Sequence, residues 1–324
     1  MAIGWGIIGC GDVTEVKSGP GFQKAEGSAL VAVMRRDGAR ARDYARRHGV
    51  PRAYDRADDL IHDRGVDAVY IATPPSSHVE LAIRVADAGK PCLVEKPMAL
   101  NHAECLWMMD AFRTRDLPLW VAYYRRALPR FTLVRDLLRD GAIGRMTSVH
   151  VQVSAPLLTG DDAAMWRVDP AIAGGGLFFD LASHSFDLLD FLSGPISDVS
   201  GFAVNTGGTY AAEDVTAAAF EFESSLVGTG VFNFNAPFKS DVMTFIGSEG
   251  ELRTPIFADT DVIVMRGDDR RVFDVRNPPH VHQPLIQTIV DQLHGRGRCP
   301  STGESAARTS WVMDRCVERY YRSL

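Results

Sequence analysis

In the first 122 residues of this 324-residue chain, short apolar runs alternate with amphipathic stretches. The apolar runs have the length and the Val, Ile and Ala content of buried strands; they lie at 3–8, 29–34, 68–72, 91–94 and 119–122. Helical periodicity fills the gaps at 37–48, 77–88 and 101–115. Ser77 and Asn101 are predicted N-caps, and Glu104 stands at capping-box spacing from Asn101. Strands alternating with helices form right-handed β-α-β units, so this part is predicted to be a doubly wound parallel sheet.

The pattern changes beyond residue 122. A helix predicted at 128–139 is followed by strand-like segments joined by short turns, at 146–155, 199–205, 215–223, 227–235, 242–246, 262–265 and 272–275. Further helices are predicted at 179–192, 283–294 and 304–321. Successive strands without helices between them indicate an antiparallel sheet. We therefore expect an α/β chain with two domains, 1–122 and 123–324, the second an α+β domain with an open antiparallel sheet.

Bulk properties exclude several classes of partner. The formal net charge of −6 does not provide the basic surface that nucleic acids require. No run approaches the roughly 20 apolar residues of a membrane span, and the first residues resemble a strand more than a signal peptide. The five cysteines form no C-x-x-C pair and have no histidine at zinc spacing. Scattered cysteines of this kind are typical of reduced thiols, so we expect a cytoplasmic protein.

A glycine pair directly follows the first predicted strand. Gly9 can make a tight turn, and Gly11 lets a pyrophosphate approach the backbone. Asp12 and Val13 then stand at a predicted helix start, where free N–H groups attract anions. The third glycine of the usual fingerprint is replaced by Thr14. The pattern predicts a dinucleotide site, with a purely structural turn as the alternative.

Two arginines end the second predicted strand, where an NAD site usually carries an acid for the ribose 2′-hydroxyl. The planar forks of Arg35 and Arg36 suit a 2′-phosphate instead. The alternative is a pair of solvated arginines, with Asp37 pairing with them or capping the next helix. We expect NADP(H) as the preferred cofactor, with NAD(H) possible.

Three further stretches are more specific. They are ATPPSSH at 72–78, EKP at 95–97, and AGGGLFFDLASH at 173–184. In this order, and with the glycine pair at the start, they resemble the Gfo/Idh/MocA oxidoreductase family, which includes glucose–fructose oxidoreductase and inositol dehydrogenase, over nearly the whole chain. The resemblance implies a Rossmann domain at 1–122 and a substrate-binding, subunit-joining domain at 123–324. It also implies hydride transfer between a nicotinamide and a hydroxyl or keto carbon of a sugar, inositol or related polyol.

The resemblance also assigns site residues. Lys96, Asp180 and His184 match the catalytic positions of the family, and Lys96 would contact both cofactor and substrate. The residues expected beside the cofactor are Thr73, Pro74, Pro75, His78 and Glu95, with Glu95 pairing locally or orienting Lys96. Trp166 and Arg167 match a segment that faces the substrate in several relatives. Tyr124 stands, before Arg125, where many relatives have Asn, so the substrate contact inferred there departs from the family pattern.

These residue types suit the implied chemistry. Oxidation of an alcohol needs a base for the hydroxyl proton, and reduction of a ketone needs an acid at the same oxygen. His184 has a side chain that titrates near neutral pH, and its four-residue spacing from Asp180 puts both on one helix face. Lys96 can hydrogen-bond the reacting oxygen and stabilise its charge. The sequence does not choose between Lys96 and His184 as proton donor.

Each residue also has a structural reading. Lys96 can be a surface lysine, Asp180 an acid favoured by a helix start, and His184 a packed histidine. His280 and His282 in PPHVHQP lack a third metal ligand, so we expect structural histidines and no metal.

Two alternatives to the dehydrogenase remain. One is a nicotinamide-binding regulator without catalysis, and the other is an oxidoreductase that retains its cofactor and couples two sugars. The outward residues of the later strands, Val227 and Val231 among them, predict a homodimer or homotetramer through the second-domain sheet. Which sugar is used, and in which direction, does not follow from the sequence.

Overall fold

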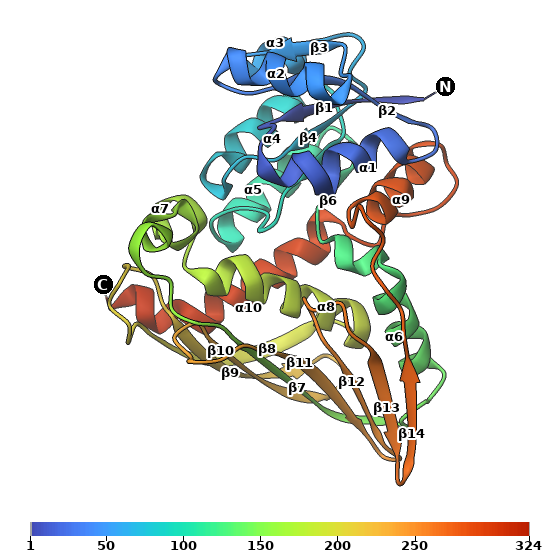
Figure 1. Ribbon diagram of the computed structural model, residues 1–324, viewed down its shortest axis with the longest axis vertical. Helices are drawn as coiled ribbons and strands as arrows, with labels where there is room; N and C mark the ends of the chain where they lie inside the picture. Colours follow the sequence, from blue (N-terminus) through green and yellow to red (C-terminus); the bar gives the residue numbers. More distant parts are fainter. Residues whose placement is uncertain (1, 324) are drawn as a thin grey trace. The chain divides into compact units, whose positions relative to one another are not determined.

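The computed structural model describes residues 2–323 and divides the chain into two compact units (Figure 1). The first unit contains the residues through Leu128 together with Pro278–Ala307, and the second contains Pro129–Asn277 and the residues from Arg308 onward. The boundary predicted at 122/123 therefore lies six residues early, and residues 278–307 belong to the first unit instead of the second. These returning residues pack helix α9 (Gln283–Leu293) against α1 (Gly19–Lys24), and Ser301 Oγ donates to the Val121 carbonyl at 2.6 Å.

The first unit is built on a six-stranded parallel sheet in the order β3-β2-β1-β4-β5-β6. Its strands are β1 (Ile3–Ile8), β2 (Ser28–Met34), β3 (Arg52–Tyr54), β4 (Ala68–Ile71), β5 (Cys92–Val94) and β6 (Leu119–Val121). All five strand pairs are parallel, which confirms the predicted doubly wound sheet. β3 was not predicted, because its three half-buried residues carry no apolar alternation.

Helices flank this sheet, and their starts test the predicted caps. They are the π-helical turn η1 (Thr14–Ser18), α1, α2 (Gly38–His48), α3 (Ala57–Ile61), η2 (Pro75–Ser77), α4 (His78–Asp87), α5 (His102–Arg113), η3 (Tyr124–Ala127) and α9. Asn101 caps α5 by accepting from the Glu104 N–H at 3.0 Å, and Glu104 reaches back to the Leu100 N–H. Ser77 does not cap α4, because its hydroxyl donates to Thr73 Oγ1 at 2.7 Å.

The second unit contains an eight-stranded sheet in the order β14-β13-β12-β11-β7-β10-β9-β8. Its strands are β7 (Met146–Ser154), β8 (Ile196–Val204), β9 (Val215–Phe222), β10 (Val227–Asn233), β11 (Ser240–Gly247), β12 (Glu251–Thr254), β13 (Val262–Arg266) and β14 (Asp269–Phe273). β7 and β10 pair in parallel, so the sheet is mixed and not antiparallel throughout as predicted. The difference arises because β7 inserts between two strands that come much later in the chain, and strand periodicity does not report pairing direction.

Helices cover one face of the mixed sheet. Figure 1 shows α6 (Pro129–Arg139), α8 (Ser183–Ser193) and α10 (Gly303–Arg322) on the same side of it. The shorter elements are η4 (Gly160–Ala164), η5 (Trp166–Val168), α7 (Pro170–Ala173) and the π-helical turn η6 (Phe178–Ala182). Phenylalanine rings fill the interface, with Phe186 of α8 5.8 Å from Phe220 of β9. The opposite face leaves apolar side chains exposed, such as Phe202, which is 65% exposed.

Among residues 2–323 we find no helix long and apolar enough to cross a membrane. The five cysteines are all buried, and none of them forms a disulfide within residues 2–323.

Candidate functional site

The glycine pair lies where the adjacent strands β1 and β4 end. Gly9 has a φ of 91°, and a Cβ there would lie 2.7 Å from Thr73 Cγ2. The N–H groups of Gly9 and Cys10 both donate to the Met34 carbonyl, which fixes the turn to the end of β2. Around Gly11, a Cβ would meet only the Gly9 carbonyl, at 3.8 Å. The predicted tight turn is therefore present, and the backbone beyond it is open to a close approach.

Thr14 explains how the loop dispenses with a third glycine. Its hydroxyl donates to the Gly11 carbonyl at 2.7 Å, and its own carbonyl accepts from Tyr44 OH of α2 at 2.8 Å. The side chain is completely buried and begins the π-helical turn η1. The Thr14 hydroxyl thus stabilises the loop through a hydrogen bond that a glycine at this position would lack.

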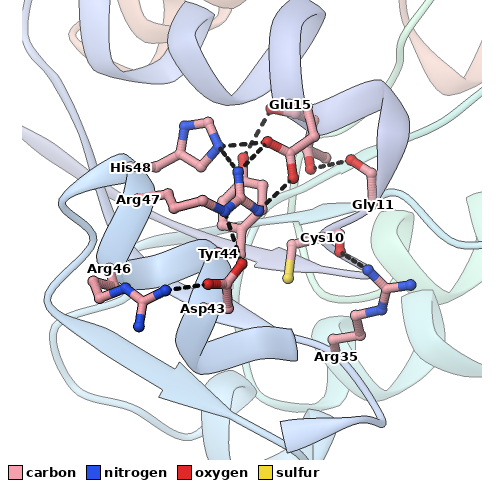
Figure 2. Close-up of polar contacts among 10 residues, drawn as sticks. Cys10, Gly11, Glu15, Arg35, Asp43, Tyr44, Arg46, Arg47 and His48 are labelled. Atoms are coloured by element: carbon pink, nitrogen blue, oxygen red, sulfur yellow. Dashed lines mark hydrogen bonds and ion pairs between the residues drawn. The ribbon is translucent and has the colours of Figure 1, made fainter. Parts of the chain in front are cut away.

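A charged cluster ties η1 to α2 (Figure 2). Arg47 holds both oxygens of Glu15, at 2.7 and 2.8 Å, and His48 Nε2 lies 2.7 Å from Glu15 Oε2. Arg47 also donates to Asp43 at 2.7 Å. The hydrogen bond from Arg47 is the main reason that the pKa of Glu15 falls to about 2. Sequence reasoning missed this cluster because its charges read as a solvated helix face.

The arginines after β2 have different environments. Arg35 is half-buried and its guanidinium donates to the Cys10 carbonyl at 3.4 Å, beside the glycine loop (Figure 2). Arg36 is exposed. Asp37 Oδ1 accepts from the N–H groups of Ala39 and Arg40, and the bond from Arg40 is the main reason that its pKa is lowered. The carboxylate therefore caps α2, one of the two alternatives considered for it.

The side chain of His78 stabilises the loop after β4. Ring nitrogens of His78 lie 2.8 Å from the Thr73 carbonyl and 3.1 Å from the Met98 carbonyl. The side chain is fully buried, and burial lowers its pKa. His78 thus joins the loop containing Pro74 and Pro75 to the segment after EKP. Its ring nitrogens face these carbonyls and not the open side of the loop.

Glu95 and Lys96 follow β5, which is the next strand in the sheet after β4. The Glu95 carboxylate accepts a hydrogen bond from Tyr70 OH of β4 and another from the Lys96 N–H at 3.1 Å. Glu95 is 8% exposed, and burial raises its pKa. Lys96 itself is half-buried and its peptide bond to Pro97 is cis. Since β1, β4 and β5 are adjacent and parallel, the glycine loop, Thr73 and Lys96 share the carboxyl edge of one sheet.

His282 of the returning segment completes this neighbourhood. Its ring stacks on Tyr124 with centroids 4.4 Å apart, and its Nδ1 lies 3.8 Å from Glu95 Oε1. Burial, followed by the charges of Lys17, Arg125 and Lys96, lowers its pKa to about 3. His280 instead contacts the Val16 carbonyl and Lys24. Residues 2–323 contain no group of three His, Cys, Asp or Glu side chains arranged for a metal ion.

In the second unit, three predicted residues converge. Arg167 Nε lies 3.7 Å from Asp180 Oδ2, and its guanidinium lies over the Trp166 ring at 4.6 Å. Asp180 lies in the π-helical turn η6, which leads directly into α8. Its side chain is 21% exposed, so the carboxylate remains within reach of a small molecule.

His184 lies in the first turn of α8, and the glycine run at 174–176 precedes the turn η6 that leads into it. His184 is buried, and its ring meets that of Phe257 edge to face at 6.0 Å. A Cβ on Gly176 would lie 2.6 Å from the Glu213 carbonyl oxygen, so dense packing requires glycine there. The Gly176 N–H donates to the Glu213 carboxyl at 2.9 Å, and burial raises the pKa of Glu213 to about 7. Gly176 is therefore part of a packed support for the site, and sequence reasoning did not identify Glu213.

Two family models match the chain. One, described as an oxidoreductase family with an NAD-binding Rossmann fold, matches residues 3–123, and the other, a GFO/IDH/MocA C-terminal domain, matches residues 131–253. Oxidoreductase P35 of Formosa agariphila is 36% identical over 315 residues, covering 96% of this chain and 97% of that protein. The 1,5-anhydro-D-fructose reductase of Ensifer adhaerens is 25% identical over 312 residues, covering 93% and 91%. A levoglucosan dehydrogenase in complex with NADH and levoglucosan has the same fold, with a TM-score of 0.88 at 22% identity over 100% of this chain and 98% of that one.

Proposed function

Because this chain belongs to the Gfo/Idh/MocA family of NAD(P)-binding oxidoreductases, we propose that it transfers hydride between NADP(H) and a hydroxyl or keto carbon of a sugar, inositol or related polyol. The observation that carries the proposal is the shared sheet edge. There the open backbone at Gly11 follows β1, and the half-buried Lys96, whose N–H is held by Glu95, follows β5; both strands are parallel and pair with β4, which lies between them. Ligands of open α/β sheets bind at such an edge.

We assign the nucleotide to the first unit, and the substrate to residues of both units, Lys96 and Tyr124 in the first and Trp166, Arg167, Asp180 and His184 in the second. Lys96 hydrogen-bonds the reacting oxygen, and His184 exchanges the hydroxyl proton, with Asp180 binding substrate or relaying protons. The remaining proposed contacts divide by ligand. For the nucleotide they are Gly9, Gly11, Asp12, Val13, Arg35, Arg36, Thr73, Pro74, Pro75, His78 and Glu95; for the substrate they are Tyr124, Trp166 and Arg167.

The experiment that tests this function is direct. Purified protein is mixed with NADP+ or NADPH and a panel of polyols and keto-sugars, and the absorbance of the reduced nicotinamide is followed. We expect turnover with at least one panel member. Tight nucleotide binding without turnover on any member would contradict the proposal and favour the regulatory alternative. Nucleotide that copurifies with the protein and cycles between two sugars would favour the sugar–sugar alternative.

Arg35 is expected to select NADP(H). Arg35→Ala should raise the KM for NADPH about 10- to 100-fold, since a charge-assisted hydrogen bond contributes roughly 1.5–3 kcal/mol. The KM for NADH should stay within about twofold, because NADH has no 2′-phosphate. Arg46→Ala is the matched control, since Arg46 is exposed on α2, the helix that follows Arg35, and pairs with Asp43 at 2.5 Å. Equal losses for NADH and NADPH would contradict this assignment.

The exposed face of the mixed sheet is proposed to join subunits. Val231 is 44% exposed and Phe202 65%. A hollow of about 390 Å³, lined by His150, Asp198 and Glu221 among others, opens on the same face. Val231 and Phe202 are both register partners of Ala217, so they are close together on this face. Exposed apolar side chains that lie together favour self-association.

We therefore expect light scattering after size exclusion to report a dimer or tetramer at micromolar concentration. Val231→Lys should shift it toward monomer, because a charge would be buried in the interface. Trp107→Lys is the control, since Trp107 is 61% exposed but lies on α5 of the first unit. A monomeric wild-type protein would contradict the proposal.

A further inference from the structure

We propose that His282 is a positioning residue for Lys96 and acts through Glu95; the inference rests on the role proposed above for Lys96. The histidine comes from PPHVHQP, a motif that the function so far leaves unused. It reaches Glu95 because the returning residues 278–307 belong to the first unit.

Glu95 is the link between the two residues. One carboxylate oxygen accepts from Tyr70 OH, and the other accepts from the Lys96 N–H at 3.1 Å. His282 Nδ1 lies 3.8 Å from the oxygen that Tyr70 holds. His282 is 1% exposed, and Nδ1 has no hydrogen-bond partner among the described residues. Burying a polar atom without a hydrogen-bond partner costs free energy, so such an atom needs an explanation. For His282 Nδ1, the explanation that we infer is its position beside the Glu95 carboxyl group.

A stacked aromatic ring holds His282 in this orientation. Tyr124 stacks on it with an interplanar angle of 29°. Arg125 in turn donates to Tyr124 OH at 3.1 Å and lies over the Tyr124 ring. Two residues earlier, His280 fastens the segment to the Val16 carbonyl at 2.7 Å. Tyr124 is itself a proposed substrate contact, so His282 supports two parts of the proposed site.

The charges around His282 keep its ring neutral. The cations that face it are Lys17 of η1, Lys96 of the loop after β5 and Arg125 of η3, and Glu95 is the acid beside it. Burial and the three cations lower its pKa to about 3, while burial raises the pKa of Glu95. A neutral ring excludes water from Glu95 without adding a charge. Loss of the polar ring edge therefore changes the hydration and ionisation of Glu95, whose carboxylate holds the Lys96 backbone.

Two substitutions separate the polar edge from the packing. His282→Phe keeps an aromatic ring on Tyr124 but removes the nitrogen that faces Glu95, whereas His282→Gln restores a polar group. We expect His282→Phe to lower kcat about tenfold or more, to shift the pH profile of kcat, and to leave the KM for nucleotide within about twofold. His282→Gln should recover most of the turnover.

Double substitution tests whether the effect passes through Glu95. If it does, Glu95→Gln with His282→Phe should turn over no more slowly than Glu95→Gln alone, since residues that act as one unit are not additive. His294→Phe is the matched control in the same returning segment and should behave as wild type, since the His294 ring bonds the Val290 carbonyl at the end of α9. Multiplied losses in the double variant, or wild-type kcat and pH profile in His282→Phe, would overturn the inference.

A second readout is independent of activity. The chain has five lysines, Lys17, Lys24, Lys90, Lys96 and Lys239. Reductive methylation with 13C-formaldehyde therefore gives few resonances, and Lys96→Arg assigns that of Lys96. We expect His282→Phe and Glu95→Gln both to move the Lys96 resonance and its titration, and His294→Phe to leave them unchanged. An unmoved Lys96 resonance in His282→Phe overturns the inference even if the wild-type enzyme is active. A moved resonance supports it even if no panel substrate is turned over, an outcome that would contradict only the proposed function.

Discussion

Lys96→Met is expected to lower kcat by about three orders of magnitude while the fold survives. Methionine preserves the length of the side chain but removes the charge and the donors proposed to hold the reacting oxygen. Loss of a preorganised donor costs about 100- to 1,000-fold, and loss of acid–base assistance about 100- to 10,000-fold. The Glu95 carboxylate holds the backbone N–H of residue 96, so this bond remains in the variant. Steady-state turnover, with thermal melting as the check on folding, measures the effect.

Lys90→Met is the matched control for this substitution. Lys90 precedes the same strand, β5, at its amino end, and its Nζ donates to the Asp63 carbonyl at 2.8 Å. Its removal should change melting slightly and turnover by less than about twofold. If Lys96→Met and Lys90→Met have the same turnover, Lys96 is not a reaction-centre group.

His184→Ala is expected to lower kcat about 100-fold or more, because the proposed proton donor is lost. The ring is 4% exposed and packs against Phe257, so its removal also leaves a cavity that lowers the free energy of unfolding. His184→Phe fills that cavity without restoring a titratable group. We expect it to recover stability but not turnover, as measured by melting and by kcat at saturating substrate.

His150→Ala is the control for this variant. His150 lies on the exposed face of β7, where its ring lies 2.9 Å from the Thr229 hydroxyl oxygen. The pH–rate profiles then separate Lys96 from His184. A limb of the pH–rate profile that is absent in His184→Phe but present in Lys96→Met reports the ionisation of His184. Turnover near that of wild type in His184→Phe would assign the proton transfer elsewhere.

Local sequence signals predicted most of the first unit, because its central strands β4 and β5 are fully buried and the helices α2 and α5 have side-chain caps. Asn101 and Glu104 are such a case, since their hydrogen bonds span a few residues. Pairing between distant segments left no such signal. The parallel pairing of β7 with β10 and the return of residues 278–307 both join parts of the chain far apart in sequence.

The same distinction applies to the candidate site. Gly9 and the EKP segment were found because each motif is contiguous and follows a predicted strand. The supports of the site were missed because their partners are distant. Glu15 and Arg47 are 32 residues apart, and Glu213 and Tyr321, joined by a 2.5 Å hydrogen bond, are 108 apart. The contact between His282 and Glu95 depends on the return of residues 278–307 to the first unit, which the sequence does not reveal.

That return limits how the protein can be dissected. A fragment that stops at Leu128 would lack α9 and the hydroxyl of Ser301 that bonds β6, and it would leave apolar surface bare on α1. A chimera that exchanges the whole first unit between relatives therefore needs three crossovers, after residues 128, 277 and 307, so that both sequence blocks of this unit come from the same parent. Residues 129–277 are inserted within the sequence of the first unit. A transplanted first unit must therefore include residues 278–307 as well as residues 1–128.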